Sequence, residues 1–112
     1  MDYRNTPRIM NEKHFKKVIE ELDNEFDSHK FIEKFMSMYE KEYVELLCSH
    51  INSSGIFRAA HAQIGKFLSD KSSLFEIEKN DRVDSQNIKK YDNENQNWRK
   101  TLWKQNDNET RK

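Results

Sequence analysis

The chain has 112 residues, the size of one domain, so two independently folding domains are not expected. Charged residues make up 36% of it and hydrophobic residues 34%, so a core must come from large side chains, chiefly the 7 Phe, 4 Tyr and 2 Trp. Lys plus Arg equals Asp plus Glu, at 20 each, which excludes a strongly basic nucleic-acid binder and an acidic tail protein.

The chain is expected to start with an irregular segment followed by an amphipathic helix. Residues 1–10 contain the single proline and no apolar periodicity, so we expect a flexible N-terminal arm. From Asn11 onward apolar residues recur at helical spacing, which predicts a helix over 11–25. The apolar positions are Phe15, Val18, Ile19, Leu22 and Phe26.

A second apolar stripe follows a capping residue. Asp27 or Ser28 supplies the side-chain oxygen that a helix N-cap needs. The polar run 40–42 interrupts the stripe that follows, so we expect two helices with a break near residues 39–41. The second of these helices is expected to end before a loop at 52–55, where turn-forming residues cluster.

A further helix is expected over residues 56–69, where apolar residues again recur at helical spacing. Gly65 lies inside it, although a glycine in a helix costs up to about 1 kcal/mol relative to alanine. We interpret this glycine as a site of close packing against another helix, since several nearby residues are also small.

The last third of the chain departs from this pattern. Apolar and charged residues alternate around Phe75 and Ile77, and Asn80-Asp81 suits a turn, so we predict a short β-hairpin near 74–84. A final helix is expected over 93–104 with Trp98 on its apolar face, and a flexible polar tail over 105–112. The prediction is one mainly α domain over 11–104, a small bundle of four to five helices that the hairpin could make winged-helix-like.

One segment carries more large apolar side chains than a single helix contact needs. We expect it to present an apolar face that binds another protein or a second copy of the chain. No nucleophile turn, phosphate-binding loop or carboxylate-metal motif occurs, so the first interpretation is a non-catalytic interaction or regulatory protein without a cofactor or small-molecule substrate. The candidate interface residues are Phe31, Phe35, Met38, Tyr39 and Tyr43.

Interleaved aromatic and basic residues support an alternative, a winged-helix-type DNA-binding regulator that uses residues 56–104. Aromatic rings can stack on bases while neighbouring cations contact phosphates. The charge balance weighs against it, because residues 72–112 hold nine Lys or Arg against eight Asp or Glu. The candidate contact residues are Arg58, Lys66, Lys89, Lys90, Trp98, Arg99, Lys100, Trp103 and Lys104.

A metal site is the third hypothesis. Cys48, His50 and His61 offer zinc-binding groups, but a structural zinc site needs four ligands and the sequence supplies no fourth. The competing interpretation makes Cys48 a small buried hydrophobic residue and His50 a helix-terminal residue. His61 is either a structural imidazole or a general base in a cleft.

Localisation is inferred from what the sequence contains. We find no apolar run that resembles a signal peptide or approaches the roughly 18 residues of a membrane span. The single cysteine also rules out a disulfide within the chain. We therefore expect a cytoplasmic protein that does not associate with a membrane.

Overall fold

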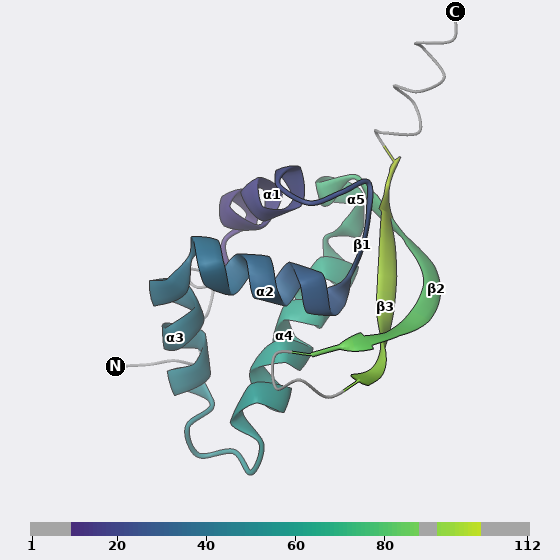
Figure 1. The fold of residues 1–112 in the computed structure, drawn as a ribbon. Coiled ribbons are helices and arrows are strands. Elements are labelled where there is room, and N and C mark those ends of the chain that lie inside the picture. Colours follow the sequence, from purple (N-terminus) through teal and green to yellow (C-terminus); the bar gives the residue numbers. More distant parts are fainter. Residues whose placement is uncertain (1–9, 88–91, 102–112) are drawn as a thin grey trace, which may run out of the picture.

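The computed structural model describes residues 10–87 and 92–101, which form five helices beside a three-stranded antiparallel sheet (Figure 1). The mainly helical prediction with a small sheet is therefore confirmed. The elements are α1 (Glu12–Glu20), β1 (Glu25–Asp27), α2 (Ser28–Met38), α3 (Glu40–Ser49), α4 (Ile56–Asp70), α5 (Ser72–Phe75), β2 (Ile77–Gln86) and β3 (Asp92–Lys100).

Helix α1 begins where expected and ends early. The side chain of Asn11 caps it by accepting hydrogen bonds from two backbone N–H groups of the first turn. The helix ends at Glu20 rather than near residue 25, because the chain turns there and the next segment pairs with β3 as strand β1. Phe26, expected on the apolar face of the helix, instead lies in this strand opposite Trp98.

The break between α2 and α3 is confirmed. Asp27 caps α2, since its carboxylate accepts a hydrogen bond from the Lys30 N–H at 2.8 Å. Helix α2 ends at Met38 and α3 begins at Glu40, with Tyr39 between them in a non-helical conformation.

Helix α4 confirms the helix expected over 56–69, but the reason given for Gly65 is wrong. Among the described residues, no heavy atom lies within 4 Å of the position that a Cβ on Gly65 would take, so no neighbouring helix requires a glycine there. At 15 residues α4 is the longest described helix, and no described helix has the length and apolar character needed to cross a membrane.

The hairpin exists but has a different turn. Strand β2 pairs antiparallel with β3, and the register shifts between Lys79 and Arg82, so the predicted turn at Asn80-Asp81 is a bulge inside one long strand. Residues that favour turns also favour bulges, because both need local departures from extended backbone. The hairpin therefore extends beyond residue 84, and short helix α5, which was not predicted, precedes it.

The helix expected over 93–104 is wrong where the structure describes it. Asp92–Lys100 forms β3, the central strand of the sheet order β1-β3-β2. Asparagine is a poor former of both helices and strands, so hydrogen bonding to two neighbouring strands decides the conformation rather than local propensity. Residues 102–104 lie outside the described residues.

The core consists mainly of aromatic rings from the helices. Phe15 lies at its centre, with ring centroids 4.9 Å from Phe31, 5.3 Å from Phe35 and 4.8 Å from Phe67. Met10, placed in the flexible arm by the sequence, is 5% exposed and belongs to this core. The sheet contributes Phe26, Ile77 and Trp98.

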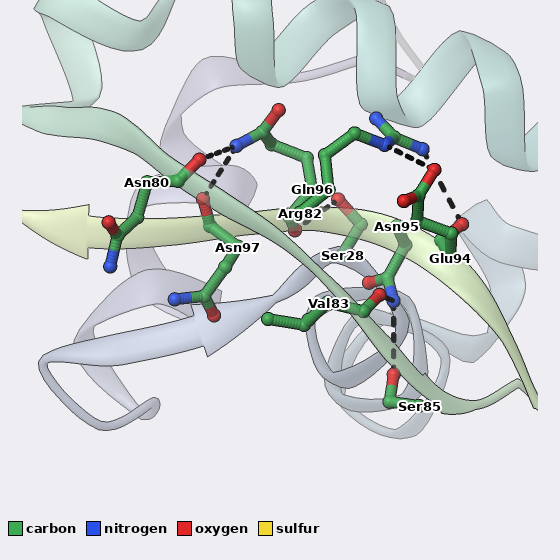
Figure 2. Close-up of polar contacts among 9 residues, drawn as sticks. All are labelled: Ser28, Asn80, Arg82, Val83, Ser85, Glu94, Asn95, Gln96 and Asn97. Carbon is green, nitrogen blue, oxygen red and sulfur yellow. Dashed lines mark hydrogen bonds and ion pairs between the residues drawn. The ribbon is translucent and has the colours of Figure 1, made fainter.

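Asn95 connects the sheet to the start of α2. This side chain is 6% exposed, and its Oδ1 accepts a hydrogen bond from the His29 N–H at 3.1 Å, so a residue of β3 satisfies an unpaired donor of α2. Its Nδ2 donates to Val83 O and to Ser85 Oγ, both at 3.1 Å and both on β2 (Figure 2). One buried amide thus joins three elements.

Ser28 makes a second connection at the same place. Its hydroxyl donates to Gln96 O at 3.2 Å and accepts a hydrogen bond from the Trp98 indole N–H at 3.2 Å. Trp98 is 1% exposed, so its ring packs under the N-terminal end of α2 while its polar atom is satisfied.

We expect Asn95→Ala to lower the free energy of unfolding by about 2 kcal/mol, because buried partners on α2 and β2 lose their hydrogen bonds. Asn97→Ala is the matched control on the same strand, since the Asn97 amide donates only an exposed hydrogen bond to Glu25. It should cost under about 0.5 kcal/mol. Urea denaturation measures both, and equal losses would contradict the role assigned to Asn95.

Candidate functional site

A cavity of about 670 Å³ lies between helix α4 and the β2–β3 hairpin, over the start of α2. We call it the α4–hairpin groove. Helix α2 contributes Ser28, His29 and Ile32 to its lining, and α4 contributes Phe57, Arg58, His61, Ala62, Gly65 and Ser69. The hairpin contributes Lys79, Arg82, Asn87, Glu94, Asn95, Gln96 and Trp98. The volume is within the range of ligand-binding clefts.

The bulge in β2 determines which charges face this groove. Side chains alternate along a strand, so residues 79 and 82 would normally point to opposite faces. The extra residue of the bulge changes this: Lys79 pairs with Trp98 and Arg82 with Gln96, and these partners are two residues apart on β3. Lys79 and Arg82 therefore lie on the same face of the hairpin.

The groove carries an excess of positive charge. Arg58, Lys79 and Arg82 are its cations, and Glu94 is its one carboxylate among the described lining residues. Arg82 Nε lies 3.1 Å from Glu94 Oε1 in an exposed ion pair, whereas Arg58 and Lys79 have no ion-pair partner in the described part of the chain. An anion in the groove would find two cations that have no ion-pair partner among the described residues.

Amide and imidazole groups complete the lining. Figure 2 shows the side chains of Arg82, Glu94 and Gln96 projecting from the same side of the hairpin. His29 Nδ1 lies 3.1 Å from the carbonyl oxygen of Ser85 and 2.9 Å from its hydroxyl. These two contacts hold the His29 ring against β2 at the edge of the groove.

His61 is held from the side of the core. Its Nε2 lies 2.7 Å from the Tyr43 hydroxyl, and its ring contacts the rings of Tyr43 and Phe57. Burial raises the pKa of Tyr43 to about 12, so the phenol keeps its proton at neutral pH and can donate it to Nε2. Of the two roles expected for His61, this geometry favours the structural imidazole.

The three proposed zinc ligands do not meet. Cys48 is exposed on α3, contrary to the buried role considered for it, and His50 Nε2 lies 2.7 Å from Gln63 Oε1. His61 bonds to Tyr43 instead, so the three side chains lie in separate surroundings. In the described ranges no three His, Cys, Asp or Glu side chains are placed together to hold a metal ion, and Cys48, His50 and His61 are not brought together.

The predicted apolar face is largely core. Phe31 and Phe35 are 0% exposed and Tyr43 is 3% exposed, because α2 packs against α1, α3, α4 and the sheet. Tyr39 is half-buried and stacks on His14, with ring centroids 4.1 Å apart. Of the five candidates only Met38 is exposed, so this prediction of a surface is wrong for the three core residues.

A different apolar surface lies on the outer side of α3. Val44 is 48% exposed and Ile51, just after the helix, is 63% exposed, with exposed Cys48 between them at helical spacing. We call these three residues the α3 stripe. The spacing of four and three residues is visible in the sequence, but the sequence alone does not show which apolar residues of this helix face the core.

The predicted nucleic-acid contacts that the structure describes do not gather on one face. Arg58 lies in the groove, whereas Lys66 lies outside it and pairs with Asp70 at 3.0 Å. Trp98 lines the groove, but its buried ring and bonded N–H leave it unavailable for base stacking. Lys89, Lys90, Trp103 and Lys104 lie outside the described residues.

The two remaining basic candidates are held within the fold. Arg99 Nε lies 3.3 Å from Glu78 Oε2, close enough for an ion pair although the angle does not make a hydrogen bond. Lys100 Nζ donates to Leu22 O at 2.7 Å, and burial lowers the pKa of this ammonium group despite nearby carboxylates. The hairpin instead contributes Lys79 and Arg82 as groove cations, and neither residue is among the contacts predicted from the sequence.

We expect the Tyr43→Phe variant to respond differently to alkaline pH. The unfolded phenol ionises near pH 10.0 and the folded one near pH 12, so this group stabilises the fold below pH 10 and loses that contribution as pH rises toward 12. The wild-type free energy of unfolding should therefore fall faster than that of the variant over this window. Urea denaturation of both proteins tests this, and identical pH profiles would contradict it.

The α4–hairpin groove thus brings together cations, amides and rings from separate elements. Such a lining suits a ligand with negative charge and hydrogen-bonding groups. No family model matches the chain, and no curated protein or solved structure matches it.

Proposed function

We propose that this protein is a non-catalytic nucleic-acid-binding domain whose α4–hairpin groove holds a phosphodiester backbone. The observation that carries the proposal is the shared face of Lys79 and Arg82, which the β2 bulge creates on the groove wall opposite Arg58. Cations that converge on a groove can contact successive phosphates of one backbone.

The arrangement of elements supports the same proposal. Helix α4 and the hairpin both line the α4–hairpin groove. The long helix α4 is followed, after the short helix α5, by the β2–β3 hairpin, and the strand order is β1-β3-β2 (Figure 1). This order is similar to that of winged-helix domains, in which a helix and a hairpin contact nucleic acid. Since a fold can serve many functions, the groove charges carry the proposal and the fold only supports it.

Replacing the groove cations should weaken binding. Arg58→Ala, Lys79→Ala and Arg82→Ala should each lower affinity for a mixed-sequence oligonucleotide several-fold and reduce the slope of log affinity against log salt by about 1. The reason is that each side chain displaces counterions from a phosphate. Fluorescence anisotropy across a salt series measures both quantities.

Two variants serve as controls. Lys66→Ala removes a cation from the same helix, outside the groove, and should change affinity little because Lys66 already pairs with Asp70. Glu94→Gln should raise affinity, since it removes the groove carboxylate and releases Arg82. Equal losses in Lys66→Ala and the groove variants, or no binding by wild type at low salt, would reject the function.

The α3 stripe favours a second candidate function, self-association. Val44 and Cys48 lie exposed on one face of α3 and Ile51 lies exposed just after it, and a second copy of the chain offers the same stripe in a two-fold arrangement. The stripe is far smaller than the roughly 800 Å² per partner of a stable interface, so the dimer should be weak.

Val44→Glu should abolish this dimer, because it would bury a charge against apolar side chains. Size-exclusion chromatography with light scattering, from micromolar to millimolar protein, measures the mass of both forms under reducing conditions. Leu74→Glu, an exposed apolar residue on α5, is the matched control and should leave association unchanged. A wild-type protein that stays monomeric throughout would remove this candidate.

A further inference from the structure

Gly65 lies in the middle of α4, where the fold itself does not need a glycine. Its φ is not positive, and among the described residues no heavy atom lies within 4 Å of its missing Cβ. Glycine is the poorest helix former after proline, so the position weakens α4 without improving packing. The open space beside Gly65 belongs to the α4–hairpin groove.

Small side chains extend this open surface along α4. Ala62, Gly65 and Ser69 are three and four residues apart and therefore share one helix face, which lines the groove. Arg58 lies on the same wall toward the start of the helix, and Lys79 and Arg82 lie on the hairpin opposite. A chain lying in the groove could thus approach the backbone of α4 while its charges meet cations on both sides.

The groove is concave, and this shape favours a single strand of nucleic acid over a duplex. Helix α4 forms one wall, the hairpin forms the other, and the start of α2 with Ile32 lies at the base. Proteins that read a duplex insert a protruding helix or ribbon into the major groove of the DNA. A walled, cationic groove instead suits one strand, whose flexible backbone can follow the groove between α4 and the hairpin.

We propose that the ligand of this groove is single-stranded nucleic acid, with its sugar-phosphate backbone lying against α4 at Ala62 and Gly65. Phosphates meet Arg58, Lys79 and Arg82. This inference rests on the proposed nucleic-acid function and adds to it the strandedness of the ligand and the place of closest approach.

Anisotropy with a labelled oligodeoxynucleotide and with the duplex of the same sequence tests the strandedness. Wild type should bind the single strand at least about tenfold more tightly than the duplex. A tenfold difference in affinity corresponds to the binding free energy of roughly one stacked base. A duplex bound as tightly as the single strand overturns the inference, while losses in the Arg58 and Arg82 variants would still support the function. If neither oligonucleotide binds, the proposed function fails and the inference fails with it.

Gly65→Leu tests the place of approach. We expect it to lower single-strand affinity at least about tenfold, by filling the space that the strand occupies. Its melting temperature should not fall below that of wild type, and Gly65→Ala should raise it by roughly 4 °C, because both residues are better helix formers than glycine. These melting temperatures separate blocked binding from unfolding.

Lys66→Leu is the matched control, since it adds the same side chain to the neighbouring position outside the groove. The Lys66→Leu and Lys66→Ala variants should bind the single strand with the same affinity. Unchanged affinity in a folded Gly65→Leu variant, or an equal loss in Lys66→Leu, overturns the placement of the strand against α4.

Discussion

The buried amide of Asn95 is the interaction on which the rest of the structure depends. It caps α2 from β3 through the His29 N–H and at the same time bonds to β2 at Val83 and Ser85. Asn95 and Asp27 are the buried polar side chains among the described residues, and both satisfy N–H groups at the start of α2. The hairpin is thereby fixed relative to the helices, and the width of the α4–hairpin groove follows from that attachment.

The helices could be predicted from the sequence because the residues that start, break and end each helix lie close together along the chain. The Asp27 cap, the break at Tyr39 and the extent of α4 all follow from residues within one or two turns. Strand β3 could not be predicted in this way, since its asparagines favour neither helix nor strand and its conformation depends on partners as distant as Glu25, which pairs with Arg99. Even Trp98, spaced as if on a helix, is buried under α2 instead.

The candidate site was only partly predictable for the same reason. Arg58 lies on a helix, so its exposed position follows from periodicity. Lys79 and Arg82 reach the groove through a bulge, and Asn80-Asp81 has the same composition whether it makes a turn or a bulge. A tight turn there would have ended the strand before Arg82 and separated the two cations. Composition alone therefore does not identify the hairpin residues that face the groove.

A net charge of +0 does not conflict with a cationic groove, because charge acts locally. Interactions between exposed charges are screened beyond a Debye length of about 8 Å at physiological salt, so a ligand in the groove responds to its lining and little to distant carboxylates. Three phosphate contacts on a single strand release roughly two counterions, a modest electrostatic gain. Close approach to the open backbone of α4 must then supply much of the remaining affinity, which is why Gly65 matters as much to the proposed site as its cations.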